Sequence, residues 1–182
     1  MRKISTLFKK DTNNLGRVIN EVNLEHEWVF NYGIPTRKFD GTSCAIIDGE
    51  LYKRFDLKKG RTLPPNAIPC QEADKITGHH PHWVKCQRND QSSKYHFMAF
   101  DELENKLDGT YELCGEKVQG NPEKIKGHKL IKHGCEVLDI KDFSFDSLRA
   151  FLETTDIEGI VFYHLTDERM CKIRKTDFGI KR

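Results

Sequence analysis

The segment Lys38-Phe39-Asp40-Gly41 precedes an apolar run, Thr42–Ile47, which is followed by Asp48-Gly49 and by a second extended run at residues 50–55. An Asp-Gly pair between two extended runs is a strong signal for a two-residue turn of type I′. The stretch therefore predicts a β-hairpin directly after the first segment. We expect this hairpin to bring Arg54 back beside the lysine.

A second hairpin is predicted late in the chain. Residues 159–165 and Met170–Arg174 have the composition of two strands, with a turn at residues 166–169. Since side chains alternate between the two faces of a strand, Lys172 and Arg174 share one face, and Lys175 lies on the other. Elsewhere in the chain, proline and glycine residues predict a Pro-rich loop at residues 63–69 and another loop at residues 78–83.

Four short motifs follow one another in a fixed order. Each alone is weak evidence, because such short patterns occur by chance in many proteins. They are Lys-Phe-Asp-Gly at 38–41, the apolar-flanked Glu112, Glu-Gly-Ile-Val at 158–161 and Lys-Ile-Arg at 172–174. Together they resemble the covalent nucleotidyltransferase superfamily of polynucleotide ligases and mRNA capping enzymes. The resemblance extends from Lys38 to about Gly179. It implies an α+β fold, a single nucleotidyltransferase (adenylation) domain over residues 1–182, built from antiparallel sheets flanked by helices.

The resemblance implies that Lys38 is the catalytic lysine, which carries the nucleotide as a phosphoramidate. A lysine attacks only as the neutral amine, and its unperturbed pKa is about 10.4. Neighbouring cations and burial lower that value. We expect Lys172 and Arg174 to have this effect and to bind the α-phosphate, where charge grows in the transition state. Glu112 suits the hydroxyls of a ribose, because a carboxylate accepts two hydrogen bonds.

The rest of the predicted nucleotide site follows from the same resemblance. Val161 is expected under the adenine, with Ile160 facing the core as strand alternation requires. His133 is our prediction for the ring on the opposite face of the base; its alternative is an ordinary core or surface histidine. Asp40 and Gly41 complete the nucleotide-binding set.

A divalent metal is expected to arrive with ATP. Mg²⁺ keeps several waters and binds through few carboxylates plus substrate phosphates. Glu158 is the catalytic carboxylate that we expect in the shell of Mg²⁺ or Mn²⁺, directly or through water. One region is rich in cysteine and histidine, the usual ligands of zinc. Its spacing fits no common zinc module and predicts a polar, partly exposed loop instead. The residues concerned are Cys70, His79, His80, His82 and Cys86.

Several details resemble the RNA ligases rather than the capping enzymes and most DNA ligases. Ser43 stands where those enzymes carry an arginine, and Thr42 directly follows the motif glycine. Residues 111–122 resemble the corresponding motif of RNA ligases, with Glu116 as a second candidate for the role of Glu112. Further stretches resemble small RNA ligases related to the vertebrate 5′-to-3′ RNA ligase, namely residues 76–79, 119–123, 128–134 and 172–179.

The predicted activity is therefore an ATP-dependent RNA ligase, which joins 5′-phosphate and 3′-hydroxyl RNA ends in RNA repair through a lysyl-AMP and an adenylated RNA end. Arg54, Lys58 and Lys59 are predicted to face the RNA ends. Only eight residues follow Arg174, so we expect no OB-fold domain. Candidates for orienting the leaving pyrophosphate are the basic residues at 58–61 and the pair Lys9-Lys10. The alternatives are a DNA ligase or guanylyltransferase, and a nucleotide- or RNA-binding module of the same fold without the chemistry.

Composition restricts the class of protein. The chain has 182 residues, with 30 Lys and Arg against 28 Asp and Glu, a net charge of +2. A strongly basic nucleic-acid coat is excluded, although basic residues gather at 53–61 and 117–132 and can form a local groove for RNA phosphates. The six cysteines include no Cys-x-x-Cys pair, and no signal peptide or membrane span is evident. We therefore expect reduced thiols in an intracellular (cytoplasmic) protein. We also expect the protein to be active as a monomer.

Overall fold

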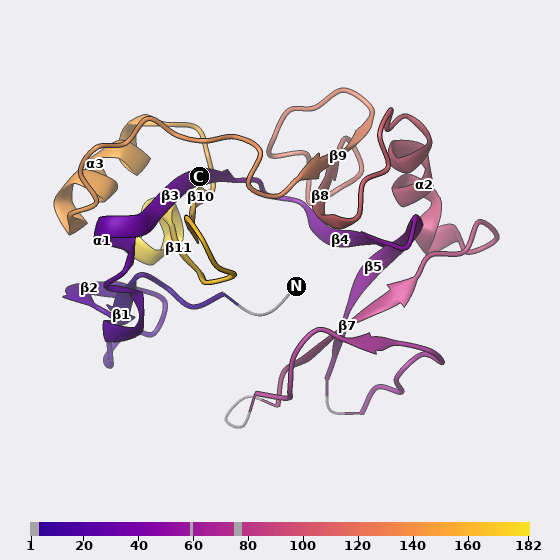
Figure 1. The fold of residues 1–182 in the computed structure, drawn as a ribbon, viewed down its shortest axis with the longest axis horizontal. Coiled ribbons are helices and arrows are strands. Elements are labelled where there is room, and N and C mark those ends of the chain that lie inside the picture. Colours follow the sequence, from indigo (N-terminus) through magenta and orange to yellow (C-terminus); the bar gives the residue numbers. More distant parts are fainter. Residues whose placement is uncertain (1–3, 59, 75–77) are drawn as a thin grey trace. The chain divides into compact units, whose positions relative to one another are not determined.

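The computed structural model describes residues 4–58, 60–74 and 78–182. The chain has a mixed α+β fold with antiparallel sheets and few helices (Figure 1). It divides into two compact units. Unit 1 is Asp40–His133, and unit 2 combines Ile4–Phe39 with Gly134–Arg182. Assignment of residues 1–182 to one nucleotidyltransferase domain stays a prediction.

Unit 2 is built around an antiparallel sheet in which β10 lies between β11 and β3. The segment before β1 continues this sheet, because Thr6 forms a parallel bridge with Lys172. Short helices complete the unit. Its strands are β1 (Phe8–Lys10), β2 (Val18–Val22), β3 (Gly33–Lys38), β10 (Gly159–His164) and β11 (Met170–Arg174); its helices are η1 (Leu24–His26), α1 (Val29–Tyr32), α3 (Phe145–Thr154) and α4 (Lys175–Phe178).

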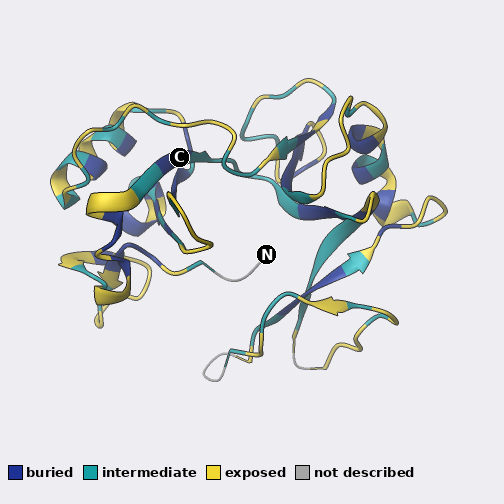
Figure 2. Cartoon of the chain, in the orientation of Figure 1, coloured by how far each residue is buried: buried dark blue, intermediate teal, exposed yellow. Residues whose placement is uncertain are grey.

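The core of unit 2 lies on one face of this sheet. Ile160 and Phe162 of β10 are fully buried, as are Cys171 and Ile173 of β11 (Figure 2). These residues alternate with the ones on the opposite face, as the period of two in a strand requires. Helix α3 is amphipathic, and it adds its buried Leu148 and Leu152 to the same cluster. The predicted second hairpin and the core-facing position of Ile160 are confirmed.

Unit 1 contains an antiparallel sheet with the strand order β6-β7-β5-β4-β8-β9. Helix α2 covers one face, where Ala99 and Phe100 pack against Ile46, Leu51 and Leu113. The strands of the unit are β4 (Thr42–Ile47), β5 (Glu50–Leu57), β6 (Ile68–Pro69), β7 (His80–Lys85), β8 (Gly109–Gly115) and β9 (His128–Lys132), and its helices are η2 (Gln91–Ser93) and α2 (Lys94–Asp101).

The predicted first hairpin is confirmed. β4 and β5 pair from Ile47–Glu50 inward, and both turn residues have positive φ, 51° at Asp48 and 74° at Gly49, which is the type I′ geometry. Arg54 pairs across the sheet with Trp83 of β7. Arg54 belongs to unit 1 and Lys38 to unit 2, so their expected closeness stays a prediction.

The loop predicted at residues 78–83 is wrong, because His80–Lys85 is strand β7 and pairs with β5 over its whole length. Pro81 suggested a loop, since proline cannot donate to a sheet ladder. It is tolerated because β6 pairs only with Trp83 and His82, so Pro81 lies where the ladder on that side ends.

None of the six cysteines, all of them in the described part of the chain, forms a disulfide. Cys44, Cys86 and Cys114 are buried in unit 1 and Cys171 in unit 2, whereas Cys135 is exposed. Across residues 4–58, 60–74 and 78–182, no helix combines the length and the apolar character needed to cross a membrane.

Candidate functional site

Basic residues gather on the face of the unit 2 sheet that points away from its core. Directly opposite residues of paired antiparallel strands share a face. The register therefore places Lys38, Lys172 and Arg174 together on this face, on the two strands that flank β10. The cross-strand rows are Lys38–Gly159–Arg174 and Thr36–Val161–Lys172. The predictions that Lys172 and Arg174 share one face and that Ile160 faces the core are confirmed, and the register adds Val161 to the face of the two basic residues.

Lys38 is held by a carboxylate. Its ammonium donates a hydrogen bond to Oε2 of Glu158, the residue that precedes β10. The side chains of Lys38 and Glu158 are 23% and 18% exposed, so both can be reached from solvent. The sequence analysis placed Glu158 near a metal and did not foresee that it binds the lysine, 120 residues away in the chain.

Lys172 is the third basic residue of the cluster. Within the described residues, its ammonium makes no hydrogen bond or ion pair. Burial, together with the nearby charges of Arg174 and Lys38, lowers the pKa of Lys172 to about 8. A half-buried ammonium beside two other cations is poised to gain free energy when an anion arrives.

Arg174 is fixed by a fully buried carboxylate. Asp177 accepts hydrogen bonds from Nε of Arg174 at 3.2 Å and from its Nη2 at 3.0 Å, and it also accepts from the backbone N–H of Arg174. A second cation, Lys10 of β1, binds the same carboxylate. Burial would raise the pKa of Asp177, but Arg174 and Lys10 hold it below the usual range.

Asp177 was not predicted as a site residue. A signal existed, because an acidic residue three positions after a strand end, at the start of a helix, is a capping pattern. Asp177 has this role in α4, since its carboxylate accepts from the N-cap backbone. No local pattern indicates that Lys10, 167 residues away, would join it.

Gly159 allows these residues to approach one another. A Cβ atom at this position would lie 2.4 Å from the carbonyl oxygen of Ile173 and 2.8 Å from Cα of Arg174. Both are backbone atoms that cannot move aside without displacing β11. The glycine therefore permits close pairing of β10 and β11 at the row that carries Lys38 and Arg174.

A second cluster, in unit 1, surrounds Glu112. Its Oε1 accepts from the backbone N–H of Gly41 at 3.1 Å, and its Oε2 lies 2.9 Å from Nε2 of His133. The other ring nitrogen of His133 lies 2.9 Å from the hydroxyl of Thr110. Glu112 is buried and held in one orientation, whereas Glu116 is exposed beyond the end of β8. The role of His133 as the adenine-stacking ring stays a prediction.

Neither a protein-family model nor a curated protein matches this chain. Its function is therefore argued from its own residues.

Asp40 and Gly41 are the first residues of unit 1, and both are fixed within that unit. The backbone N–H of Asp40 donates to Oε1 of Glu123 at 2.9 Å, a contact that the sequence analysis missed. A Cβ atom at Gly41 would lie 2.2 Å from the carbonyl oxygen of Leu113, so only glycine fits against β8 here. Asp40 and Gly41 therefore have structural partners, in addition to their predicted part in nucleotide binding.

Arg54 lies on the same sheet face as Glu112 and Ser43. Ser43 pairs with Glu112, and alternation from the Cys44–Lys53 pair puts Arg54 on that face too. This is the face away from α2. The hydroxyl of Ser43 is buried and has no hydrogen-bond partner in the described residues.

Arg54 also has the partner that would make it a purely structural residue. Its Nε donates to Oδ1 of Asp56 at 3.0 Å, and His79 approaches the same oxygen at 3.3 Å. Burial would raise the pKa of Asp56, but Arg54 and His79 keep it lowered. Lys58, the next predicted RNA-binding residue, is exposed, and Lys59 lies outside the described residues.

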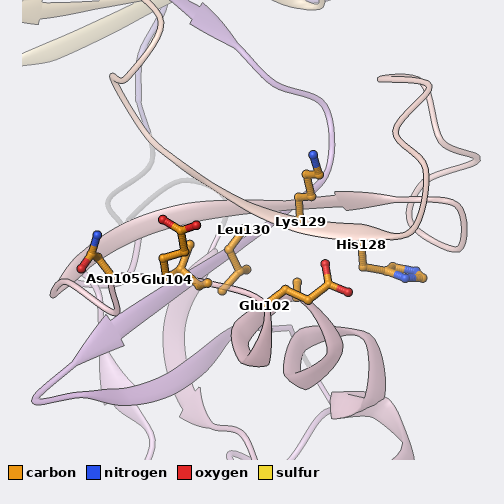
Figure 3. Close-up of a pocket in the computed structure, with 8 residues that line it drawn as sticks. Glu102, Glu104, Asn105, His128, Lys129 and Leu130 are labelled. Atoms are coloured by element: carbon orange, nitrogen blue, oxygen red, sulfur yellow. The ribbon is translucent and has the colours of Figure 1, made fainter.

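One other feature of unit 1 stands apart from the predicted site. A pocket of about 420 Å³ lies between the end of α2 and β9 (Figure 3), and none of the predicted site residues lines it. Its walls are Ala99, Glu102, Leu103, Glu104, Asn105, His128, Lys129 and Leu130. Across the described residues, no group of three or more His, Cys, Asp or Glu side chains is arranged to hold a metal ion.

Proposed function

We propose that this chain is an ATP-dependent RNA ligase with a nucleotidyltransferase fold, in which Lys38 becomes covalently linked to AMP. One observation carries the proposal. Three basic side chains share the face of one small sheet that lies opposite its core, and the one expected to be the nucleophile, Lys38, is held by Glu158. The order of the four sequence motifs supports the same reading.

The first step is nucleotidyl transfer. Nζ of Lys38 forms a bond to the α-phosphorus of ATP, and the bond from that phosphorus to the oxygen that bridges to the β-phosphate breaks. The electron pair of that bond leaves with pyrophosphate. Nζ changes from an ammonium to a phosphoramidate N–H, and the two protons that it loses pass to solvent and to pyrophosphate. Lys172 and Arg174 neutralise the charge that builds on the α-phosphate oxygens.

The remaining residues bind and orient the nucleotide. The motif resemblance assigns Glu112 to the ribose hydroxyls, Val161 to the adenine and His133 to the opposite face of the base. Glu158 fits the expected metal as a partly exposed carboxylate beside the lysine, and it would hold Mg²⁺ or Mn²⁺ directly or through water. When bound, the metal neutralises charge on the phosphate oxygens.

The later steps act on RNA. A 5′-phosphate oxygen of the RNA attacks the phosphorus of the lysyl-AMP and releases Lys38. A 3′-hydroxyl then attacks the adenylated end, forms the phosphodiester and expels AMP. Arg54, Lys58 and Lys59 are assigned to the RNA ends, where the guanidinium of Arg54 offers a bidentate fit to a phosphate.

The test is covalent labelling. The purified protein is incubated with Mg²⁺ and with ATP or GTP radiolabelled at the α-phosphate, and then run on a denaturing gel. We expect an acid-labile label from ATP, which Lys38→Ala abolishes and which Lys141→Ala, at a surface position 88% exposed, retains. Pre-adenylated RNA should bypass much of the Lys38→Ala defect.

Other outcomes would replace the proposal. A label from GTP indicates a guanylyltransferase, and sealing of DNA but not RNA ends by the labelled protein indicates a DNA ligase. A protein that takes no label from either nucleotide, but binds one of them or RNA, is a binding module without the chemistry.

A further inference from the structure

Lys10 is joined to the phosphate-binding residues of unit 2 through one carboxylate. Its Nζ donates to Oδ1 of Asp177, whose side chain is fully buried and also binds Arg174. The side chain of Lys10 is 32% exposed, and that of Arg174 is 33% exposed. Asp177 therefore holds two cations side by side, each of them partly open to solvent.

The path of the chain explains this position. Residues 5–7 run parallel to β11, because Leu7 donates its N–H to the carbonyl of Lys172 and Lys172 donates its N–H to Ser5. A parallel neighbour advances in the same direction as β11. β1 therefore continues toward the end of β11 that carries Arg174, which is the end of the sheet where Lys38 also lies.

Both cations retain hydrogen-bonding capacity. A lysine ammonium has three N–H donors and a guanidinium has five. Within the described residues, Lys10 donates only to Asp177, and Nη1 of Arg174 makes no hydrogen bond. These remaining donors can meet an anion without loss of the contacts to Asp177.

The charge balance favours an anion larger than one phosphate. Lys10, Lys38, Lys172 and Arg174 are four cations, against the two carboxylates of Glu158 and Asp177. If only the α-phosphate were bound, the charges of Lys38, Lys172 and Arg174 would suffice to neutralise it. The additional cation, Lys10, is explained by a polyphosphate.

We propose that Lys10 binds the β- and γ-phosphates of ATP and stabilises the leaving pyrophosphate during formation of the Lys38–AMP bond, an inference that rests on the proposed function. As the bond between the α-phosphorus and its bridging oxygen breaks, the oxygen that keeps the electron pair becomes more negative. The ammonium of Lys10 neutralises that charge.

Lys141 serves as the control. It belongs to the same unit and is paired with Asp139, but its side chain is 88% exposed and it has no part in the proposed site. Three rates are compared in Lys10→Ala, Lys141→Ala and the wild type. They are the single-turnover transfer of AMP from ATP to the protein, the reversal of that adduct by added pyrophosphate, and the sealing of pre-adenylated RNA, in which pyrophosphate has no part.

We expect Lys10→Ala to slow the two pyrophosphate-dependent reactions about 10- to 100-fold, the usual effect of one charge-assisted contact. Sealing of pre-adenylated RNA should stay within about twofold of the wild type, and Lys141→Ala should leave all three rates unchanged. Lys10→Arg should recover much of the loss, because it keeps the positive charge.

Two results would overturn the assignment. Unchanged transfer and reversal in Lys10→Ala would exclude Lys10 as a pyrophosphate ligand. An equal loss in the sealing of pre-adenylated RNA would mean that Lys10 acts only by positioning Asp177 and Arg174. If the wild type forms no adduct with ATP, the proposed function fails instead. Calorimetric binding of pyrophosphate to the wild type and Lys10→Ala then still decides whether Lys10 belongs to a polyphosphate site.

Discussion

Two lysines on one face of the same sheet have opposite surroundings. Lys38 is held by the carboxylate of Glu158, whereas Lys172 has no partner in the described residues and lies beside Arg174. In the proposed ligase, the first arrangement orients the nucleophile, and the second leaves a cation in need of an anion. The two lysines thus divide attack and charge neutralisation between them in that proposal.

The lowered pKa of Lys172 predicts a pH-dependent affinity for ATP. Lys172 is protonated below about pH 8 and loses its charge above it. A bound phosphate favours the charged form, so binding above pH 8 must take up a proton, and the affinity falls as the pH rises. The measurement is the Kd of α,β-methylene ATP, which cannot transfer AMP, between pH 7 and 9.

The control for this prediction is Lys172→Arg. A guanidinium stays protonated over the whole range, so its affinity should not change with pH. Above pH 8 the affinity of the wild type should fall by up to about tenfold for each pH unit, the limit for one linked proton. Identical pH profiles for the wild type and Lys172→Arg would contradict the assignment of Lys172 to phosphate binding.

Arg54 is expected to act on RNA rather than on ATP. Arg54→Ala should leave adenylation measurable but slow the sealing of RNA ends about 10- to 100-fold, because a bidentate phosphate contact is lost. Arg54→Lys should recover only part of that loss. Both steps are measured in single turnover, with Lys85→Ala as a control on the same sheet face, at a position 52% exposed.

The ion pair with Asp56 provides the opposing expectation. If Arg54 serves only to pair with Asp56, its loss costs little in any step, since partly exposed pairs contribute little. Equal and small effects of Arg54→Ala and Lys85→Ala on RNA sealing would therefore refute the RNA-binding role.

At the scale of elements, β10 separates the core of unit 2 from its predicted site. Ile160 and Phe162 anchor the strand on one face, and the alternate residues carry the site face. Its first residue, Gly159, sits between Lys38 and Arg174, where a Cβ atom would meet the backbone of β11. The packing of this one strand therefore sets the spacing of the basic residues.

Gly159→Ala should destabilise the protein and displace Arg174. The added methyl group would meet backbone atoms of Ile173 and Arg174, and overpacking of this kind costs about 1–3 kcal/mol. The free energy of unfolding in urea measures this effect. Gly16→Ala is the control, because its methyl group would meet only the side chain of Asn14, at 3.2 Å. Equal stability of the two variants would contradict the close approach at β11.

Helix α2 carries a buried histidine that should make unit 1 sensitive to acid. Both ring nitrogens of His96 are buried without a hydrogen-bond partner in the described residues. Burial lowers the pKa of His96 to about 4, with a further contribution from Lys53. Between pH 6.5 and 4 the unfolded chain binds this proton and the folded chain does not, so stability is lost as the pH falls.

His96→Leu should therefore stabilise the protein more at pH 5 than at pH 7.5. The expected extra gain is about 2 kcal/mol, the linkage for the interval between pH 6.5 and 5. Urea unfolding at both pH values measures it. Met98→Leu, on the exposed side of the same helix, should show no such difference between the two conditions. An equal effect of His96→Leu at both pH values would contradict the buried neutral state.

At the scale of the whole molecule, local chemistry made the two hairpins predictable. The Asp48-Gly49 turn and the period of two in residues 159–174 place strand ends and faces without any tertiary information. The face shared by Lys172 and Arg174 follows from that period alone, whereas Val161 joins it through the register of β10 with β11. Lys38 joins this face only through the pairing of β3 with β10, which the sequence did not predict.

The contacts that fix the site could not be predicted, because they join distant residues. Glu158 reaches Lys38 across 120 residues, and Asp177 reaches Lys10 across 167. The Glu112 carboxylate accepts from Gly41, 71 residues earlier, and no local pattern indicates that pairing. β7 was missed for a related reason, since its pairing with β5 outweighs the local signal of Pro81.

The reactivity of the buried thiols reports how often the core of each unit opens. Cys44 lies in the core of unit 1 and Cys171 in that of unit 2, and burial raises the pKa of both thiols. The thiolate is the species that alkylating reagents attack, so these cysteines stay inert until the surrounding core separates. Cys135, which is exposed, reacts at any time and serves as the internal reference. Mass spectrometry of alkylated peptides can thus measure the rate at which each unit opens, independently and within one wild-type chain.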